Sequence, residues 1–196
     1  MSKKIRRIII ALVLLVVIVI AAGGLGYYYI LAPNTTVNDD GIVYVRDSAN
    51  SVSRVFETLR RQGYIKSIHT LSGVAKLKRF VSQVRPGRYK IRDGMNNNEL
   101  INMLRAGNQY PVIFTFNNMR TLEEFATKAT EELAVSKNEL LTLLKDTDVL
   151  ANLGFDSCTI MAMFIPKTYQ IYWNTSALDL LKRMKKEYDR FWNENR

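Results

Sequence analysis

The chain has 196 residues, 28 Lys and Arg against 18 Asp and Glu, and a formal net charge of +10. It holds one cysteine and one histidine, which excludes a disulfide-stapled secreted scaffold and a zinc site built from Cys and His. No zinc-finger, helix-turn-helix or RNA-recognition signature is present, so we expect no nucleic-acid partner. Apolar residues follow Cys158 closely, and we interpret it as a buried, inert thiol. We interpret His69 as structural or exposed.

The chain begins with a membrane signal. Ile8 to Leu31 is a run of 24 residues without a charge, and about 20 apolar residues span a hydrocarbon core. Four basic residues (Lys3, Lys4, Arg6 and Arg7) lie in the preceding tail, 1–7, so the positive-inside rule predicts a cytoplasmic N-terminus and an extracytoplasmic remainder. A cleaved signal peptide is the alternative. The uncharged run is longer than an ordinary signal core, which favours a single-pass transmembrane helix at 8–31.

Residues 32–41 are polar and rich in turn-forming residues, which predicts a short linker that leads away from the bilayer. Outside the N-terminal tail the chain carries 24 basic against 18 acidic residues, a net charge of +6. A well-solvated surface explains this excess. Attraction to an anionic partner also explains it, and that partner would be either lipid headgroups or an anionic cell-wall polymer.

Residues 42–117 predict a compact α+β subdomain. β-branched and aromatic residues indicate three strands, at 42–46, 87–91 and 110–116. Apolar residues at helical spacing indicate two helices, at 51–63 and 67–81. Asn96 and Glu99 have the spacing of a capping box, and Gly107 is typical of a helix end, so a third helix is expected between them. Phe56 and Tyr89 are the expected core.

Residues 118–196 predict further helices. Capping-box spacing recurs at Thr121 and Glu124, and again at Ser136 and Glu139, each time before apolar residues at helical spacing. A last helix starts near Ser176, and its apolar residues are predicted to share one face. These residues are Leu178, Leu181, Met184, Tyr188 and Phe191.

Four segments together carry a family resemblance. They are the N-terminal anchor, "IVYVRDSANSVSRVFETLRRQGYI", "RPGRYKIRDGMNNNELINMLRAGN…VIFTF" and "FIPKTY", which stands where the family has Phe-Pro-Asp-Thr-Tyr. In order and spacing the chain resembles the MltG (YceG-like) family of membrane-anchored endolytic murein transglycosylases. The resemblance implies an α+β fold with one transmembrane helix, a LysM-like subdomain at 42–117 and the helical beginning of a catalytic domain at 118–196.

The resemblance also implies an activity. Family members cleave nascent peptidoglycan strands between N-acetylmuramic acid and N-acetylglucosamine, leaving 1,6-anhydro ends, with no cofactor. They work at the bacterial inner membrane, facing the periplasm, beside peptidoglycan synthases. A pyridoxal-phosphate lyase, another label attached to the family, would need a cytoplasmic site, which the predicted topology disfavours. A non-catalytic, membrane-tethered module that binds cell wall or docks on a synthase is the alternative function.

The chain departs from the family pattern near this motif. Ile160, Met161 and Ala162 stand where the family usually has Leu-Glu-Gly, and Lys167 replaces the motif's Asp. The family's catalytic glutamate is expected downstream of Arg196, so we expect no catalytic residue in this chain and interpret it as a truncated member.

No acid of the chain combines a predicted apolar and aromatic setting with a catalytic motif, which is the environment that a proton-donating glutamate needs. Glu99, Glu124 and Glu139 have helix-capping positions, and Glu187 stands among Lys and Arg in the last helix. The aromatic stretch Met163–Trp173 could stack on sugars or form core. We expect Phe164 in the core, and retain Tyr169 and Trp173 as candidate substrate-binding residues. We expect no metal site.

Overall fold

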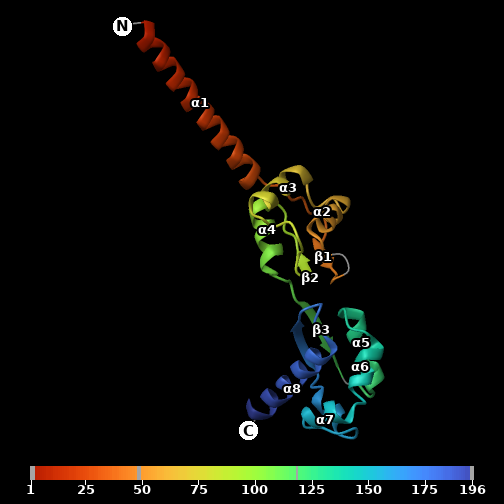
Figure 1. Cartoon of the computed structure of the whole chain (residues 1–196). Coiled ribbons are helices and arrows are strands. Elements are labelled where there is room, and N and C mark those ends of the chain that lie inside the picture. Colours follow the sequence, from red (N-terminus) through yellow and green to blue (C-terminus); the bar gives the residue numbers. More distant parts are fainter. Residues whose placement is uncertain (1–2, 48–49, 118, 195–196) are drawn as a thin grey trace. The chain divides into compact units, whose positions relative to one another are not determined.

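The computed structural model describes residues 3–47, 50–117 and 119–194, and its mixed α+β content agrees with the predicted fold class (Figure 1). The chain forms two compact units, Met1–Asn108 and Gln109–Arg196. Each unit has its own buried cluster of apolar side chains.

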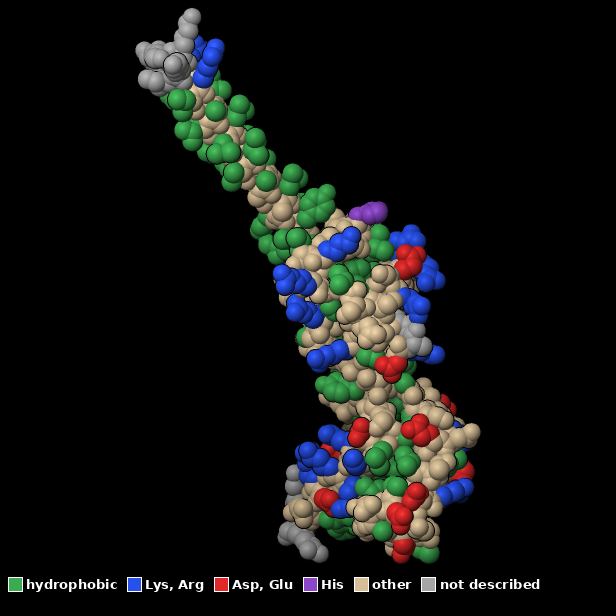
Figure 2. Space-filling model, in the orientation of Figure 1, with side chains coloured by type: hydrophobic (Ala, Val, Ile, Leu, Met, Phe, Trp, Pro, Cys, Tyr) green, Lys and Arg blue, Asp and Glu red, His purple; other side chains and the backbone are tan. Residues whose placement is uncertain are grey.

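The first unit starts with helix α1 (Lys3–Leu31). Its span Arg6–Leu31 is long and apolar enough to cross a membrane. Apolar side chains cover the helix on the visible face (Figure 2), and most are exposed from Ile8 to Leu31. Exposed apolar side chains along a whole helix suit a lipid environment, and this agrees with the predicted transmembrane helix.

The rest of the first unit is a two-stranded antiparallel sheet packed on three helices. The elements are β1 (Ile42–Val45), α2 (Val52–Arg61), α3 (Ile68–Leu77), β2 (Gly87–Lys90) and α4 (Asn97–Ala106). In the register of the sheet, Ile42 lies opposite Lys90 and Val45 opposite Gly87. Alternation along each strand turns Val43 and Tyr89 inward. Phe56 and Tyr89 are both buried in this cluster, as predicted.

Local capping explains where the helices of this unit begin and end. The predicted capping box of α4 is present, because Asn96 accepts from Glu99 N and Glu99 accepts from Asn96 N. Gly107 ends the helix with φ +73°. The expected helix 67–81 is too long, since α3 ends at Leu77. Arg79 follows with φ +54°, a left-handed conformation that stops the helix.

Replacing Arg79 with glycine should stabilise the first unit. Among the described residues Arg79 is the one non-glycine residue with positive φ, and a left-handed conformation costs a side-chain-bearing residue about 1–2 kcal/mol. Glycine avoids that cost but loses more backbone entropy on folding. We therefore expect Arg79→Gly to raise the free energy of unfolding by up to about 1 kcal/mol, measured by urea titration. Arg79→Ala serves as the control, because it removes the side chain and keeps the strain.

The expected linker 32–41 is instead fastened to the first unit. Asn34 and Thr35 are buried. The side chain of Asn34 donates to Ser67 O at 2.9 Å and to Asn97 Oδ1 at 2.6 Å, and it accepts from Ser67 N at 2.8 Å. Asn97 Nδ2 in turn donates to Tyr29 O at 2.7 Å. These bonds are buried or partly buried, and they attach the end of α1 to the starts of α3 and α4. A composition rich in turn formers could not reveal such an attachment.

Gly41 closes this segment onto the sheet. It has φ +64°, and a Cβ placed there would lie 2.2 Å from Ile91 O. Its own carbonyl accepts from Ile91 N at 2.7 Å, so the backbone contact needs a residue without a side chain.

The second unit contains β3 (Val112–Phe116), α5 (Leu122–Glu132), α6 (Lys137–Leu143), α7 (Thr147–Asn152), the 3-10 helix η2 (Ile160–Met163), β4 (Lys167–Ile171) and α8 (Ala177–Glu194). Strand β3 pairs with β4, with Phe114 opposite Tyr169. The predicted subdomain boundary at 117 is therefore wrong. The strand 110–116 belongs to the second unit, because its inward residues pack in that unit's cluster.

Two expectations for the helices of the second unit are also wrong. Within the described residues, the side chain of Ser136 makes no capping bond to α6, although Thr121 accepts from Glu124 N as predicted. In α8, Leu178 and Phe191 are exposed, whereas Ala177 and Leu180 are fully buried. The buried face of α8, which packs on η2 and α6, is thus rotated relative to the predicted one, although Leu181 and Met184 belong to both.

Candidate functional site

The aromatic stretch Met163–Trp173 and helix α8 together line a cavity of about 300 Å³. Its lining residues are Ile165, Pro166, Lys167, Tyr169, Glu187, Arg190 and Phe191. The Pro-Lys-Thr-Tyr motif therefore lies at the wall of a hollow, where its backbone turns from η2 into β4.

Tyr169 is held in this wall by both its ring and its hydroxyl. Strand alternation turns it inward, where it is 4% exposed, and its ring stacks on Phe116 with centroids 5.3 Å apart. The hydroxyl donates to Ile165 O. Burial, and secondarily the nearby charge of Glu187, raise the pKa of Tyr169 to about 12. Tyr169 is thus a neutral, positioned phenol with one ring face covered by protein.

Glu187 is buried, which the sequence did not predict. It stands among basic residues as expected, yet it is 6% exposed and shares the cavity with Tyr169. Its Oε1 lies 2.8 Å from Arg183 Nη2 and 3.5 Å from Arg190 Nη1. Glu187 lies about one turn from each arginine on α8, so the helix itself supplies both partners. Two guanidinium groups make Glu187 an ion-paired carboxylate, which does not resemble a proton donor in an apolar pocket.

Cationic and anionic side chains share the cavity. Lys167 and Arg190 line it together with one carboxylate, and Arg183 pairs with that carboxylate from α8. Across the described residues, His, Cys, Asp and Glu side chains form no group of three that could hold a metal ion. What the cavity can do chemically is orient an anionic or hydroxyl-bearing ligand.

The two candidate sugar-binding residues lie in different settings. Tyr169 lines the cavity, as described. Trp173 is partly buried against the apolar cluster of the second unit, and its carbonyl accepts from Ala134 N at 2.7 Å. Trp173 is not among the residues that line the cavity beside Tyr169, and the role of both residues in binding stays a prediction. Phe164 is 7% exposed, in the core as expected, and Tyr172 is 55% exposed.

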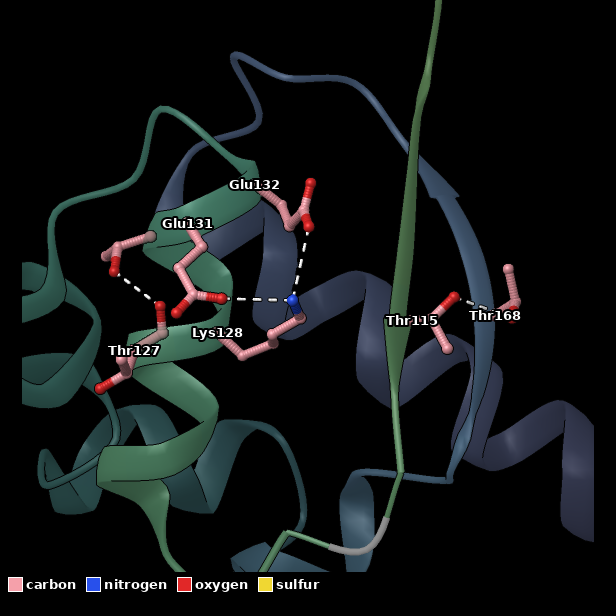
Figure 3. Close-up of polar contacts among 7 residues, drawn as sticks. Thr115, Thr127, Lys128, Glu131, Glu132 and Thr168 are labelled. Atoms are coloured by element: carbon pink, nitrogen blue, oxygen red, sulfur yellow. Dashed lines mark hydrogen bonds and ion pairs between the residues drawn. The ribbon is translucent and has the colours of Figure 1, made fainter.

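Several other polar side chains of the second unit have partners within that unit. Figure 3 shows Lys128 on α5 bonded to Glu131 and Glu132, and the Thr115 and Thr168 hydroxyls 2.9 Å apart across β3 and β4. Glu123 is also exposed and pairs with Lys145 at 3.8 Å. The acids of α5 are therefore solvated, as the sequence indicated.

Cys158 is exposed, which corrects the expectation of a buried thiol. It lies in a turn in which Asp156 accepts from the backbone N–H groups of Cys158 and Thr159, and the apolar residues after it turn inward as η2. His69 is exposed, which is one of the two interpretations drawn from the sequence.

Comparison with known proteins identifies the family. The profile of the YceG-like family matches residues 43–196, so the match covers the second unit and the first unit from Val43 onward. The chain belongs to the YceG-like family. No curated protein matches it. It is similar to the crystal structure of a yceG-like protein from Listeria monocytogenes at 17% identity, with a TM-score of 0.41 and coverage of 78% of this chain.

This YceG-like chain spans about half the length of that solved structure, 55%. The motif that led to the family from sequence, Phe164-Ile165-Pro166-Lys167-Thr168-Tyr169, lies within the matched residues. The missed residue of the site is Glu187. Its burial depends on β4 packing beside α8, and its signal in the sequence is weak: a glutamate with arginines four residues before it and three after it.

Tyr89 and Tyr169 should make the two units sensitive to alkali. Burial raises the pKa of each to about 12, above the ordinary value near 10. Between about pH 10 and pH 12 the unfolded chain has lost these protons and the folded chain keeps them, so stability falls as the pH rises. We expect a loss of up to about 2–3 kcal/mol for each tyrosine. Urea titrations at several pH values, with Tyr89→Phe and Tyr169→Phe as matched controls, measure it.

Proposed function

We propose that this chain is part of an endolytic peptidoglycan transglycosylase. The protein would cleave nascent glycan strands between N-acetylmuramic acid and N-acetylglucosamine and leave 1,6-anhydro ends. The observation that carries the proposal is the YceG-like family match over residues 43–196. The apolar helix α1 supports it, because an enzyme that trims newly made strands at the membrane gains from an anchor there.

The reaction needs one carboxyl group with two duties. As an acid it protonates the glycosidic oxygen of the leaving sugar, and as a carboxylate it then helps the muramic 6-hydroxyl close onto C1. Water is not the nucleophile, which separates the reaction from two-carboxylate hydrolysis. The family resemblance implies that this glutamate lies in a helix downstream of the motif Pro166-Lys167-Thr168-Tyr169. The cavity beside Tyr169 would contribute to holding the glycan.

A single-pass helix and the positive-inside rule support a matching topology. The basic tail 1–7 would stay in the cytoplasm, and both units would face the periplasm, where peptidoglycan is assembled. Peptidoglycan strands are the proposed substrate and the peptidoglycan synthases are proposed partners.

The second candidate function is a non-catalytic module that tethers cell wall or a synthase to the membrane. One observation favours it. In the described part of the chain, the acid that lines the cavity is Glu187, which is ion-paired to two arginines. Under this alternative the cavity binds an anionic group and performs no chemistry.

An extended protein distinguishes the two functions. If the reading frame continues past Arg196, the longer protein should convert purified peptidoglycan to products with 1,6-anhydro ends, identified by mass spectrometry. Changing its downstream family glutamate to glutamine should abolish those products, since glutamine cannot donate a proton. A longer, folded protein that binds peptidoglycan and releases no anhydro product would support the tethering module instead.

A further inference from the structure

The positive charge of the chain is segregated. Residues 32–108 carry 13 Lys and Arg against 6 Asp and Glu, a net charge of +7, whereas residues 109–196 carry 11 against 12, a net charge of −1. From Thr58 to Arg92 there are ten Lys and Arg and no Asp or Glu. Figure 2 agrees: basic side chains predominate over the first unit, and the second unit mixes both signs. The excess that the whole chain shows is therefore a property of the first unit.

Part of this charge is combined with exposed apolar side chains at the end of α3. Residues 76–81, here called the basic turn, read Lys-Leu-Lys-Arg-Phe-Val. Leu77 is 76% exposed and Val81 is 63% exposed, while Phe80 is buried and anchors the turn in the core. Phe80 N donates to Ala75 O at 2.8 Å and Arg79 N to Lys76 O at 3.0 Å. This is the bonding of a Schellman helix end, so the exposed residues project from a fixed backbone.

Further basic residues lie beside the basic turn, on α4 and in the segment before β2. Lys78 Nζ donates to Asn102 Oδ1 at 2.6 Å, and Arg105 Nη1 to Lys78 O at 3.4 Å. Arg85 donates to Ala106 O at 3.3 Å. Cations thus surround the carbonyl end of α4, where the helix dipole also favours them. The dipole explains Lys78, Arg85 and Arg105. It does not explain Lys76, Leu77 or Val81.

The basic turn lies close to the end of α1. Asn97 of α4 is bonded to Tyr29 O, and Lys78 is bonded to Asn102, five residues further along the same helix. At 1.5 Å per residue this places the ammonium group of Lys78 about 7.5 Å along α4 from the attachment point. The headgroup layer is about 5–8 Å deep on each side of the hydrocarbon, and Lys and Arg side chains extend several ångströms further.

We propose that the basic turn binds the surface of the bilayer in which α1 is anchored. Lys76, Lys78 and Arg79 contact anionic phospholipid headgroups, and Leu77 and Val81 enter the boundary between headgroups and acyl chains. The proposal rests on α1 spanning the membrane and is independent of any transglycosylase activity. Contact between the basic turn and the bilayer would hold the first unit against the membrane at a second point besides α1.

Lipid suits this surface better than an anionic wall polymer. A polymer of phosphates or carboxylates would use the cations and leave Leu77 and Val81 exposed to water. A bilayer surface uses both, since interfacial segments combine apolar side chains with Lys and Arg. The left-handed backbone of Arg79 is a further argument for an anionic partner at this surface. Glycine would fit the backbone there with less strain, and an arginine in that position supplies a charge.

A fluorophore at position 77 tests the proposal locally. The native thiol is exposed, so Cys158→Ser removes it and Leu77→Cys provides a single labelling site for the environment-sensitive dye NBD. The full chain is reconstituted through α1 into vesicles of phosphatidylcholine, or of phosphatidylcholine and phosphatidylglycerol in equal parts. We expect NBD emission to rise at least about twofold, with a blue shift, in the anionic vesicles. The rise should vanish in about 1 M NaCl, where charges are screened beyond about 3 Å.

Matched variants identify the residues responsible. Lys76→Glu with Arg79→Glu should abolish the rise, and Val81→Ser should reduce it. Lys182→Glu with Lys186→Glu changes the net charge equally on the exposed face of α8 and should leave it intact. Arg79→Gly separates lipid binding from stability most clearly. It should weaken the lipid response without destabilising the first unit. If Arg79 had only a structural role, this variant would leave the lipid response unchanged.

Several results would overturn the proposal. They are equal emission in neutral and anionic vesicles, an unchanged response in Lys76→Glu with Arg79→Glu, or equal loss in the α8 control. A label that responds to soluble anionic wall polymer and not to anionic vesicles would assign the surface to the polymer, and the lipid proposal would fail. Because the salt and vesicle comparisons keep every charge of the basic turn, they decide the matter even if a charge variant misfolds.

Discussion

Purified peptidoglycan incubated with residues 32–196 should release no product with a 1,6-anhydro end. Such a product requires a carboxyl group that first donates and then accepts a proton at the glycosidic bond. A glutamate able to donate near neutral pH has to be desolvated among apolar or aromatic groups, away from neutralising cations. We expect the rate to equal that of peptidoglycan without protein, measured by mass spectrometry of the soluble products.

The described glutamates named below each differ from a glutamate that is desolvated among apolar groups and away from cations. Glu131 and Glu123 are exposed, Glu132 is half-buried, and all three are paired with lysines. Glu99 and Glu124 accept backbone N–H groups at helix starts. Glu187 alone combines burial with an aromatic neighbour, and its two arginines favour a fixed carboxylate.

A positive result would therefore have a definite meaning. If residues 32–196 do generate anhydro ends, the expectation that the catalytic residue lies downstream is wrong, and Glu187→Gln becomes the decisive variant. Glu139→Gln is a suitable control, because Glu139 is an exposed residue at the start of α6. An active Glu187→Gln protein would exclude Glu187 as well.

Local chemistry made much of this fold predictable. The capping box at Asn96 and Glu99 and the glycine at 107 mark α4 at both ends, since the signals lie within the helix they bound. Period-2 alternation placed Tyr89 in the core, and the uncharged run located α1. Each of these inferences needs only residues that are close in sequence.

What could not be predicted depends on contacts between distant segments. Strand 110–116 was recognised, but its partner β4 lies more than fifty residues later, and only that pairing assigns the strand to the second unit. The burial of Glu187 has the same origin, because a glutamate among Lys and Arg is typical of a solvated helix face until Tyr169 packs beside it. The burial of Asn34 likewise needs Ser67 and Asn97 to converge on it.

Phe125→Ala should unfold the second unit at much lower denaturant concentration and leave the first unit unchanged. Phe125 is fully buried, and its ring centroid lies 4.0 Å from that of Phe164 and 5.6 Å from that of Phe116. Truncation removes a large apolar side chain and leaves a cavity that β3 and η2 cannot fill, because strand pairing fixes their backbones. We expect a loss of about 3–5 kcal/mol from the free energy of unfolding of this unit.

The two tryptophans make the measurement specific. Trp173 and Trp192 both belong to the second unit, so tryptophan fluorescence follows its unfolding alone, while far-ultraviolet circular dichroism follows both units. Phe56→Ala is the matched control, since Phe56 is 2% exposed in the separate cluster of the first unit. It should shift the circular dichroism transition by a similar energy and leave the tryptophan transition in place. If Phe56→Ala shifted the tryptophan transition as far as Phe125→Ala does, the two clusters would unfold as one cooperative unit and their independence would be refuted.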